Sequence, residues 1–211
     1  MEQQILPGRD IPDTELIVRI LHGEKQMFEW IIRRYNQRLY RMGMSILGND
    51  TDAEEAMQSA YVKAYEHLGQ FEARSSFGTW LTRIMINESM AQKNKQGRTG
   101  NTKKQLETNA ALRTPDQILI NKELSGILEN AISGLPEKYR LVFVLREVEG
   151  MSVRDTGDAL DIADTNVKVR LNRAKSMLRH HLNSYMKDQA FSFHLTRCDL
   201  MVKNVFARLQ I

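Results

Sequence analysis

Apolar residues recur every three or four positions along most of the 211-residue chain, and no stretch of useful length alternates between apolar and polar residues. This period places apolar side chains on one face of an α-helix, whereas a half-buried strand requires a period of two. The first two apolar stripes are Leu16, Ile17, Ile20 and Leu21, followed by Phe28, Ile31, Ile32, Tyr35, Leu39 and Met42. The pattern therefore predicts an all-α protein.

A polar segment divides this helical pattern into two halves. Residues 96–114 contain few large apolar side chains, which is typical of a flexible connector. We therefore expect two small helical domains joined by a flexible linker. The predicted boundaries are an N-terminal domain over residues 1–95, a linker over 96–117, a C-terminal domain over 118–186 and a C-terminal extension over 187–211.

Charge and hydropathy restrict the class of protein. A net charge of +4 and a pI near 9.2 favour a polyanionic partner. The N-terminus lacks a basic segment followed by an apolar run, so a signal peptide is not expected. No apolar run approaches the ~20 residues that cross a bilayer. We therefore expect a cytoplasmic chain that does not insert into membranes.

No metal site, cofactor or catalytic set is predicted. His194 and Cys198 lie one helical turn apart, but two ligands are too few for a closed zinc site, which usually has four. The other histidines are scattered, and no phosphate-binding loop or Ser/His/Asp arrangement has a recognisable spacing. An enzyme is therefore the least favoured class.

In the N-terminal half, polar residues predict where a central helix begins. Thr51-x-x-Glu54 is typical of a capping box and predicts a helix over residues 52–68, which Gly69 ends. A short loop then leads to a further helix over residues 77–95.

The C-terminal half has the pattern of a helix-turn-helix. Ser152-x-x-Asp155 predicts the start of a short helix. A tight turn is expected near Asp161. Asp164 is expected to cap a longer, basic helix that runs to about Leu182.

The basic helix has two different faces. Its apolar face is Val167, Leu171, Ala174 and Leu178, which we expect to pack on the preceding helices. On the other side, Arg and Asn can bind base edges, valine can touch a thymine methyl group, and Lys and Arg can hold phosphates. The residues expected at duplex DNA are Thr165, Asn166, Lys168, Val169, Arg170, Asn172 and Arg173. From periodicity alone, a solvated helix whose basic face has no function is an equally good interpretation.

The segment LPEKYRLVFVLREVEGMSVRDTGDALDIADTNVKVRLNRAKSMLR, residues 135–179, resembles region 4 of sigma factors. The resemblance implies that this helix-turn-helix binds the promoter −35 element. Asp161 stands where the family often has glycine in the turn. Thr156-Gly157 replaces the usual apolar-alanine pair and is expected to weaken the short helix. Ala163 replaces the common capping serine, which leaves Asp164 to cap.

Acidic residues gather at the start of the helix expected over residues 52–68. The helix dipole favours the carboxylates of Asp50, Asp52, Glu54 and Glu55 there, and charge alone supports only this capping interpretation. However, FEWIIRRYNQRLYRMGMSILGNDTDAEEAMQSAYVKAYEHLGQF resembles sigma regions 2.1 and 2.2. The resemblance implies that this helix binds the coiled-coil clamp of the polymerase β′ subunit. The matching positions are Asp52, Glu55 and Gln58, and Ser59 stands where the family usually has an acid.

The next segment, FEARSSFGTWLTRIMINESMAQKNK, resembles sigma regions 2.3 and 2.4, which open the promoter −10 element. Trp80, Arg83 and Asn87 are expected along one helix edge, where they offer single-stranded DNA a stacking surface, a cation and an amide. A buried, purely structural Trp80 is the alternative. The resemblance implies that Asn87 lies in a pocket for a flipped base and Lys63 near the DNA backbone. The residues expected at the −10 element are Lys63, Phe71, Ser75, Ser76, Trp80, Arg83 and Asn87.

Both segments together make the chain similar to extracytoplasmic-function (ECF) sigma factors. The resemblance implies transcription initiation in response to stress or another signal. It implies as partners promoter DNA and core RNA polymerase, through the β′ clamp coiled coil and the β subunit, with an anti-sigma factor as a further candidate. The main alternative is a stand-alone helix-turn-helix regulator, which would leave the N-terminal segments unexplained. No role is predicted for the extension.

Overall fold

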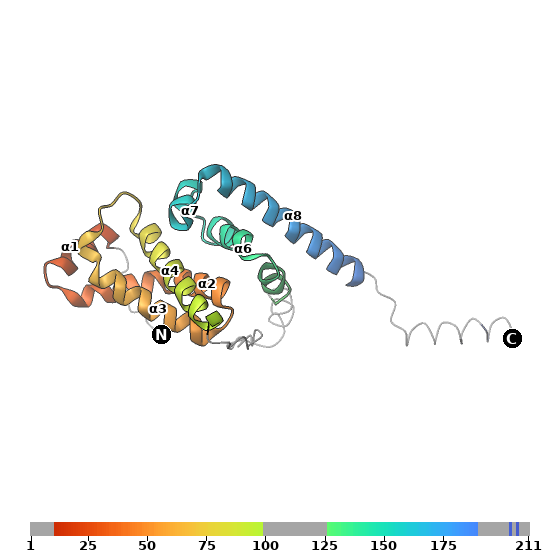
Figure 1. Ribbon diagram of the computed structural model, residues 1–211, viewed down its shortest axis with the longest axis horizontal. Helices are drawn as coiled ribbons and strands as arrows, with labels where there is room; N and C mark the ends of the chain where they lie inside the picture. Colours follow the sequence, from red (N-terminus) through yellow and green to blue (C-terminus); the bar gives the residue numbers. More distant parts are fainter. Residues whose placement is uncertain (1–10, 99–125, 190–202, 204–205, 207–211) are drawn as a thin grey trace, which may run out of the picture.

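The structure is a computed structural model that describes residues 11–98 and 126–189, together with Lys203 and Phe206. Every element in these ranges is helical (Figure 1), as the apolar period predicts. Most of the predicted linker and of the C-terminal extension, including His194 and Cys198, lies outside the described residues.

Within residues 11–98, four α-helices and two 3₁₀ turns build the N-terminal half, drawn from red to yellow-green in Figure 1. Helices α2, α3 and α4 pack on one another, and α1 packs on α2. The elements are α1 (Asp13–Leu21), η1 (Lys25–Met27), α2 (Phe28–Leu47), α3 (Asp50–Glu66), η2 (Leu68–Gln70) and α4 (Phe77–Arg98).

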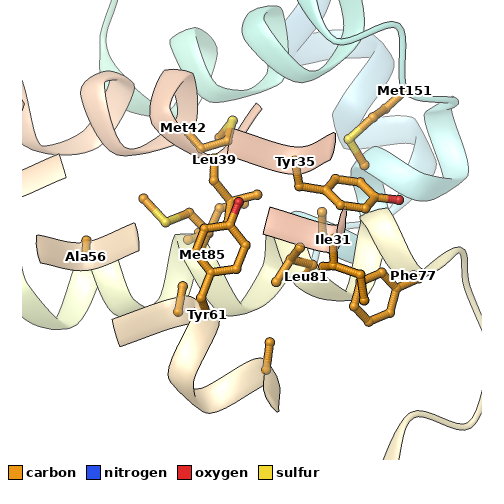
Figure 2. Packing of buried hydrophobic residues seen from close by; sticks show 14 of the residues in the cluster. Ile31, Tyr35, Leu39, Met42, Ala56, Tyr61, Phe77, Leu81, Met85 and Met151 are labelled. Carbon is orange, nitrogen blue, oxygen red and sulfur yellow. The ribbon is translucent and has the colours of Figure 1, made fainter. Parts of the chain in front are cut away.

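The core of this half lies between α2, α3 and α4. Leu39 and Met42 of α2 and Leu81 and Met85 of α4 are fully buried there (Figure 2). Burying each of these side chains stabilises the fold by about 1.5–3 kcal/mol. Gly43 lets α2 approach α3 closely, because a Cβ at this position would lie 3.0 Å from the Cβ of Ala53 and 2.8 Å from Cε of Met85.

The start of α3 differs from the prediction. Asn49 caps the helix, since its side-chain oxygen accepts a hydrogen bond of 2.8 Å from the backbone N–H of Asp52. Thr51 is therefore a residue within the helix, and the predicted Thr51 capping box is wrong. The helix also ends at Glu66, and Gly69 lies in the separate turn η2.

The C-terminal half begins with a helical segment over residues 126–133. It continues as α6 (Glu137–Phe143), the π-helical turn η3 (Val144–Val148), α7 (Val153–Leu160) and α8 (Asp164–Gln189). In η3 the backbone N–H of Glu149 donates to the carbonyl oxygen of Val144 at 2.9 Å, five residues back. Gly150 follows with a positive φ of 66°. Glycine adopts that conformation without a steric penalty, so the chain turns here towards α7.

Side-chain capping and a left-handed residue define α7, as predicted. Ser152 accepts a hydrogen bond of 3.0 Å from the backbone N–H of Asp155, which confirms the predicted start. Asp161 has φ 55° and ψ 49° and makes the tight turn. The prediction for Asp164 is off by one position: it is the first residue of α8 and Ala163 precedes it. Helix α8 continues beyond the expected end to Gln189.

The two halves share one hydrophobic cluster. Met151 and Leu145 of the C-terminal half are buried in the same cluster as Tyr35 and Leu39 of α2. Figure 2 shows the Met151 side chain pointing towards the ring of Tyr35. Helix α7 also packs against α4 (Figure 1). The predicted helical domains are therefore in direct contact, which the sequence pattern did not indicate.

Candidate nucleic-acid interface

An aromatic cluster supports the loop between η2 and α4. The rings of Phe71 and Trp80 lie 5.4 Å apart, and Phe77 packs at the same distance from each of them. Phe77 is buried, whereas Phe71 and Trp80 are only partly buried. Trp80 is therefore neither a fully buried core residue nor a free one: part of its indole packs inward and part remains accessible.

A hollow of about 380 Å³ lies beside this cluster. Its lining includes Phe71, Ser75, Trp80 and Arg83, so the structure brings four of the predicted −10 residues together. The other lining residues are Gln70, Glu72, Ala73, Arg74, Thr79, Arg154 and Asp158. Aromatic faces next to guanidinium groups can bind single-stranded nucleic acid by stacking and by phosphate contacts.

The remaining predicted −10 residues lie outside the hollow. Ser76 caps α4, because its hydroxyl oxygen accepts from the backbone N–H of Thr79 at 3.1 Å. Asn87 is exposed further along α4. Lys63 on α3 forms an ion pair of 2.6 Å with Glu88 on α4. Asn87 and the charged pair therefore extend the candidate surface away from the hollow.

The predicted polymerase-binding residues lie at the start of α3. Glu55 and Gln58 are exposed, and Asp52 is partly buried. Gln92 of α4 donates to Glu55 at 3.0 Å. Asp52 is engaged with the capping Asn49 through both its backbone N–H and its carboxylate. Glu55 and Gln58 are thus available to a partner, whereas Asp52 also stabilises the helix.

Helix α8 has the two faces that the sequence predicts. Val167 and Ala174 are completely buried and Leu178 nearly so. The side chains on the opposite face are exposed, and they include polar, charged and apolar types that can contact base edges and phosphates. Of the predicted −35 residues, Arg170 is half-buried and the others are exposed: Thr165, Asn166, Lys168, Val169, Asn172 and Arg173.

The side chain of Arg173, one of these exposed residues, is positioned by a tyrosine on α6. Arg173 donates a hydrogen bond of 3.2 Å to the hydroxyl of Tyr139 on α6. This contact lowers the pKa of the Tyr139 phenol, because the cation favours the phenolate form. Lys175, on the flank, pairs at 2.9 Å with Glu147. The Tyr139 hydroxyl therefore helps to fix the orientation of the Arg173 guanidinium.

Sequence reasoning missed the contribution of α7 to the hollow. Arg154 and Asp158 are exposed, lie one turn apart on α7 and line the hollow from the C-terminal half. Their spacing of four residues is an ordinary feature of a solvated helix face, so no sequence signal distinguished them. Within residues 11–98 and 126–189, no helix is long and apolar enough to span a membrane.

Comparison with known proteins connects both halves to one family. Residues 31–99 match Sigma-70 region 2, and residues 125–178 match Sigma-70, region 4. The ECF RNA polymerase sigma factor SigW of Bacillus subtilis is 30% identical over 178 residues, which cover 79% of this chain and 94% of SigW. The chain belongs to the ECF sigma factor family. It is therefore a promoter-recognising sigma factor, as the resemblance implied.

Another relative and a solved structure agree with this membership. The RNA polymerase sigma-H factor of Pseudomonas aeruginosa is 27% identical to this sigma factor over 186 residues, which cover 83% of the chain and 96% of the relative. The sigma factor RpoE, solved with the anti-sigma factor NepR from Bartonella quintana, superposes with a TM-score of 0.62. That match covers 74% of this chain and 96% of RpoE at 22% identity, and it shows the shared helical fold.

Proposed function

We propose that this sigma factor divides promoter recognition between its two halves. The hollow beside Trp80 receives bases of the melted −10 strand, and the exposed face of α8 enters the major groove at the −35 element. The observation that carries the proposal is the pairing of these surfaces in one chain: an aromatic hollow with an adjacent cationic edge on α4, and a helix-turn-helix with an exposed polar helix. A stand-alone helix-turn-helix regulator has no need of the first surface.

Energetics favours a role in binding and holding melted DNA. Unstacking a base step costs a few kcal/mol. Stacking on an aromatic side chain returns roughly 1–3 kcal/mol per base, and both Phe71 and Trp80 are partly exposed to solvent. Capture of a few bases is therefore enough to hold open a duplex that a polymerase has already strained. Asn87 is our candidate for reading one of these bases, and Lys63 for a phosphate contact.

Core RNA polymerase is the proposed protein partner. The exposed Glu55 and Gln58, with Asp52 beside them, would face the β′ clamp coiled coil, and the C-terminal half would contact the β subunit. An anti-sigma factor is a further proposed partner, because a similar sigma factor has been solved in complex with one. Such a partner would have to cover at least one of the three surfaces described here.

Run-off transcription tests this function directly. Purified chain is added to core polymerase from the source bacterium on genomic fragments, and the start sites are mapped. We expect transcripts that require the added chain and share upstream elements near −35 and −10. Tight, sequence-specific binding to promoter DNA without core polymerase, combined with no transcripts, would instead favour the stand-alone regulator.

Two substitutions on α8 should separate base reading from phosphate binding. Arg173→Ala should weaken binding to matched −35 DNA by about 1–3 kcal/mol and scrambled DNA much less, because a bidentate contact to a base edge is sequence-dependent. Lys168→Ala should weaken binding to both and lower the salt slope by about one. Titration of labelled duplexes with the chain bound to core polymerase, at several salt concentrations, measures both effects.

Tyr139→Phe is the matched control for Arg173. It removes the acceptor of the Arg173 hydrogen bond and retains the guanidinium. A small, sequence-dependent loss is expected, smaller than that of Arg173→Ala. Equal losses on matched and scrambled DNA for Arg173→Ala would contradict base reading by this residue.

A further inference from the structure

A second hollow, of about 410 Å³, lies in the C-terminal half between residues 131–136 and the distal part of α8. Its lining includes Ala131, Leu135, Pro136, Met177, His180 and His181. Ala131 and Leu135 are buried, and they belong to the small hydrophobic cluster that also contains Ala174 and Leu178 of α8. The hollow is therefore bounded by core residues of this half.

Two large apolar side chains at this hollow remain exposed. Met177, which lines it, is 40% exposed, and Leu128, three residues before Ala131, is 45% exposed. Residues three apart lie on the same side of a helix, so Leu128 continues the apolar lining along the helical segment 126–133. We call Leu128 and the lining of the hollow the α8 groove. Exposed apolar surface that is continuous in this way is typical of a binding site.

The C-terminal extension carries apolar residues at a helical spacing. Val202, Val205, Phe206 and Leu209 occupy positions i, i+3, i+4 and i+7, and Cys198 lies one turn before them. This is the spacing with which an amphipathic helix binds in an apolar groove. Of these residues the structure describes Phe206, which is helical and 50% exposed. The ring of Phe206 is therefore available for burial elsewhere.

The connecting chain is long enough to bring the extension back to the α8 groove. Figure 1 shows the last turns of α8 extending beyond the other helices. From Met177 to Gln189, the end of α8, the helix is about 18 Å long at a rise of 1.5 Å per residue. The residues from 190 to 201 can span about 40 Å when they are extended. A segment that begins at residue 202 can therefore reach the groove by running back along α8.

Membership of the same chain favours this segment over a separate protein as the occupant. A short connection between two surfaces gives them an effective concentration in the millimolar range. A groove that binds the free segment with a dissociation constant of about 0.1 mM would then be occupied in about nine chains out of ten. Apolar burial on both sides supplies the driving force, because Phe206, Leu128 and Met177 are all exposed without this contact.

We propose that residues 202–209 of the C-terminal extension dock as an amphipathic helix in the α8 groove, with the Phe206 ring in the hollow beside Met177. The docked helix runs antiparallel to α8, since the connecting chain starts at the end of that helix. The extension thereby completes the core of the C-terminal half, whose own cluster is small.

The single cysteine of the full-length chain makes this contact measurable. Cys198 lies one turn outside the docked segment, so a nitroxide label attached there leaves the apolar contact intact. The label broadens the methyl signals of methionines near it in a nuclear magnetic resonance spectrum, and Met177→Leu identifies the signal of Met177. With about nine chains in ten docked, the Met177 signal should fall to about a tenth of its intensity with the reduced label. The signal of Met42, which is buried in the N-terminal half, should not change.

Two substitutions in the extension provide a matched comparison. Phe206→Glu places a carboxylate in the apolar groove and should restore most of the Met177 signal. Asn204→Glu makes a charge change of the same sign two residues away, where the helical period places the side chain on the other side of the segment. It should leave the broadening as in the wild type. Val202→Glu is a second disrupting variant and should act as Phe206→Glu does.

The possible outcomes distinguish the occupants of the groove. A wild-type Met177 signal that the label does not broaden would overturn the docking, and so would equal broadening in the wild type and in Phe206→Glu. In a mixture of nitroxide-labelled chains with isotope-labelled chains that carry no nitroxide, broadening of Met177 would show that the extension of a second copy occupies the groove, which contradicts docking within one chain. All these measurements use the chain alone, so their result does not depend on the proposed promoter function.

Discussion

Reversing the charges of Asp52 and Glu55 to lysine is expected to weaken binding to core RNA polymerase by at least about thirtyfold, or roughly 2 kcal/mol. Glu55 is exposed at the start of α3, where it accepts a hydrogen bond from Gln92, so its charge can act on a partner at the surface. Close charge pairs across protein interfaces couple by roughly 1.5–7 kcal/mol. Equilibrium binding of labelled chain to core polymerase measures the loss.

The structure improves the design of this experiment. Asp52 also takes part in the Asn49 cap, so its replacement weakens α3 as well as the proposed interface. Glu55→Lys alone leaves the cap intact and should still lower affinity. Glu15→Lys with Glu66→Lys makes the same change in net charge at two exposed sites away from the start of α3. Equal losses for this control and for the Asp52/Glu55 variant would argue against a specific polymerase contact.

Gly157→Ala is expected to destabilise the C-terminal half by about 1–3 kcal/mol, the range for an overpacked core position. Helix propensity alone predicts the opposite, a gain of roughly 0.5–1 kcal/mol when alanine replaces glycine in a helix. The added Cβ would lie 2.8 Å from the backbone carbonyl oxygen of Ile162 and 3.2 Å from the carboxylate of Asp164. The closer atom, the carbonyl oxygen of Ile162, belongs to the backbone of the turn and cannot move aside without shifting that turn. Urea denaturation followed by circular dichroism measures the change.

Gly97→Ala is the matched control, because this glycine also lies in a helix but a Cβ there meets nothing within 4 Å. It should stabilise the protein slightly or leave stability unchanged. Opposite signs for the two substitutions would show that close packing, rather than helix propensity, selects glycine at position 157. A stabilising Gly157→Ala would show that the turn relaxes easily and that the short helix is weak for local reasons.

Local features of the fold were predictable from the sequence. The cap at Ser152 and the left-handed turn at Asp161 follow from side-chain chemistry within a few residues. The buried face of α8 follows from its period, as Val167 and Ala174 show. In contrast, Asn49 and Thr51 are both good caps two residues apart, and local sequence cannot choose between them.

The missed features depend on residues far apart in the chain. Glu149 meets Arg38 across 111 positions, and nothing in either segment marks it as the partner of an arginine pair. Arg154 and Asp158 likewise join the hollow only because α7 packs on α4. The family resemblance placed the candidate −10 residues on α4, on the loop before it and on α3, but it could not indicate which of these residues face the other half. Ser76, predicted to contact DNA, also serves as the cap of α4.

The π-helical turn η3 contains one residue more than an α-helical turn. The direction in which the residues after η3 point therefore depends on that one additional residue. The η3 hydrogen bond from Glu149 to Val144 encloses one more residue than an α-helical turn does. Deleting one residue between 144 and 148 would restore ordinary α-helical bonding and rotate the following chain by about 100° about the helix axis. Glu149 and Met151 would then point away from α2. Insertion or loss of a single codon at this turn would therefore change how the two halves pack on each other, while both candidate DNA-binding surfaces keep their sequences.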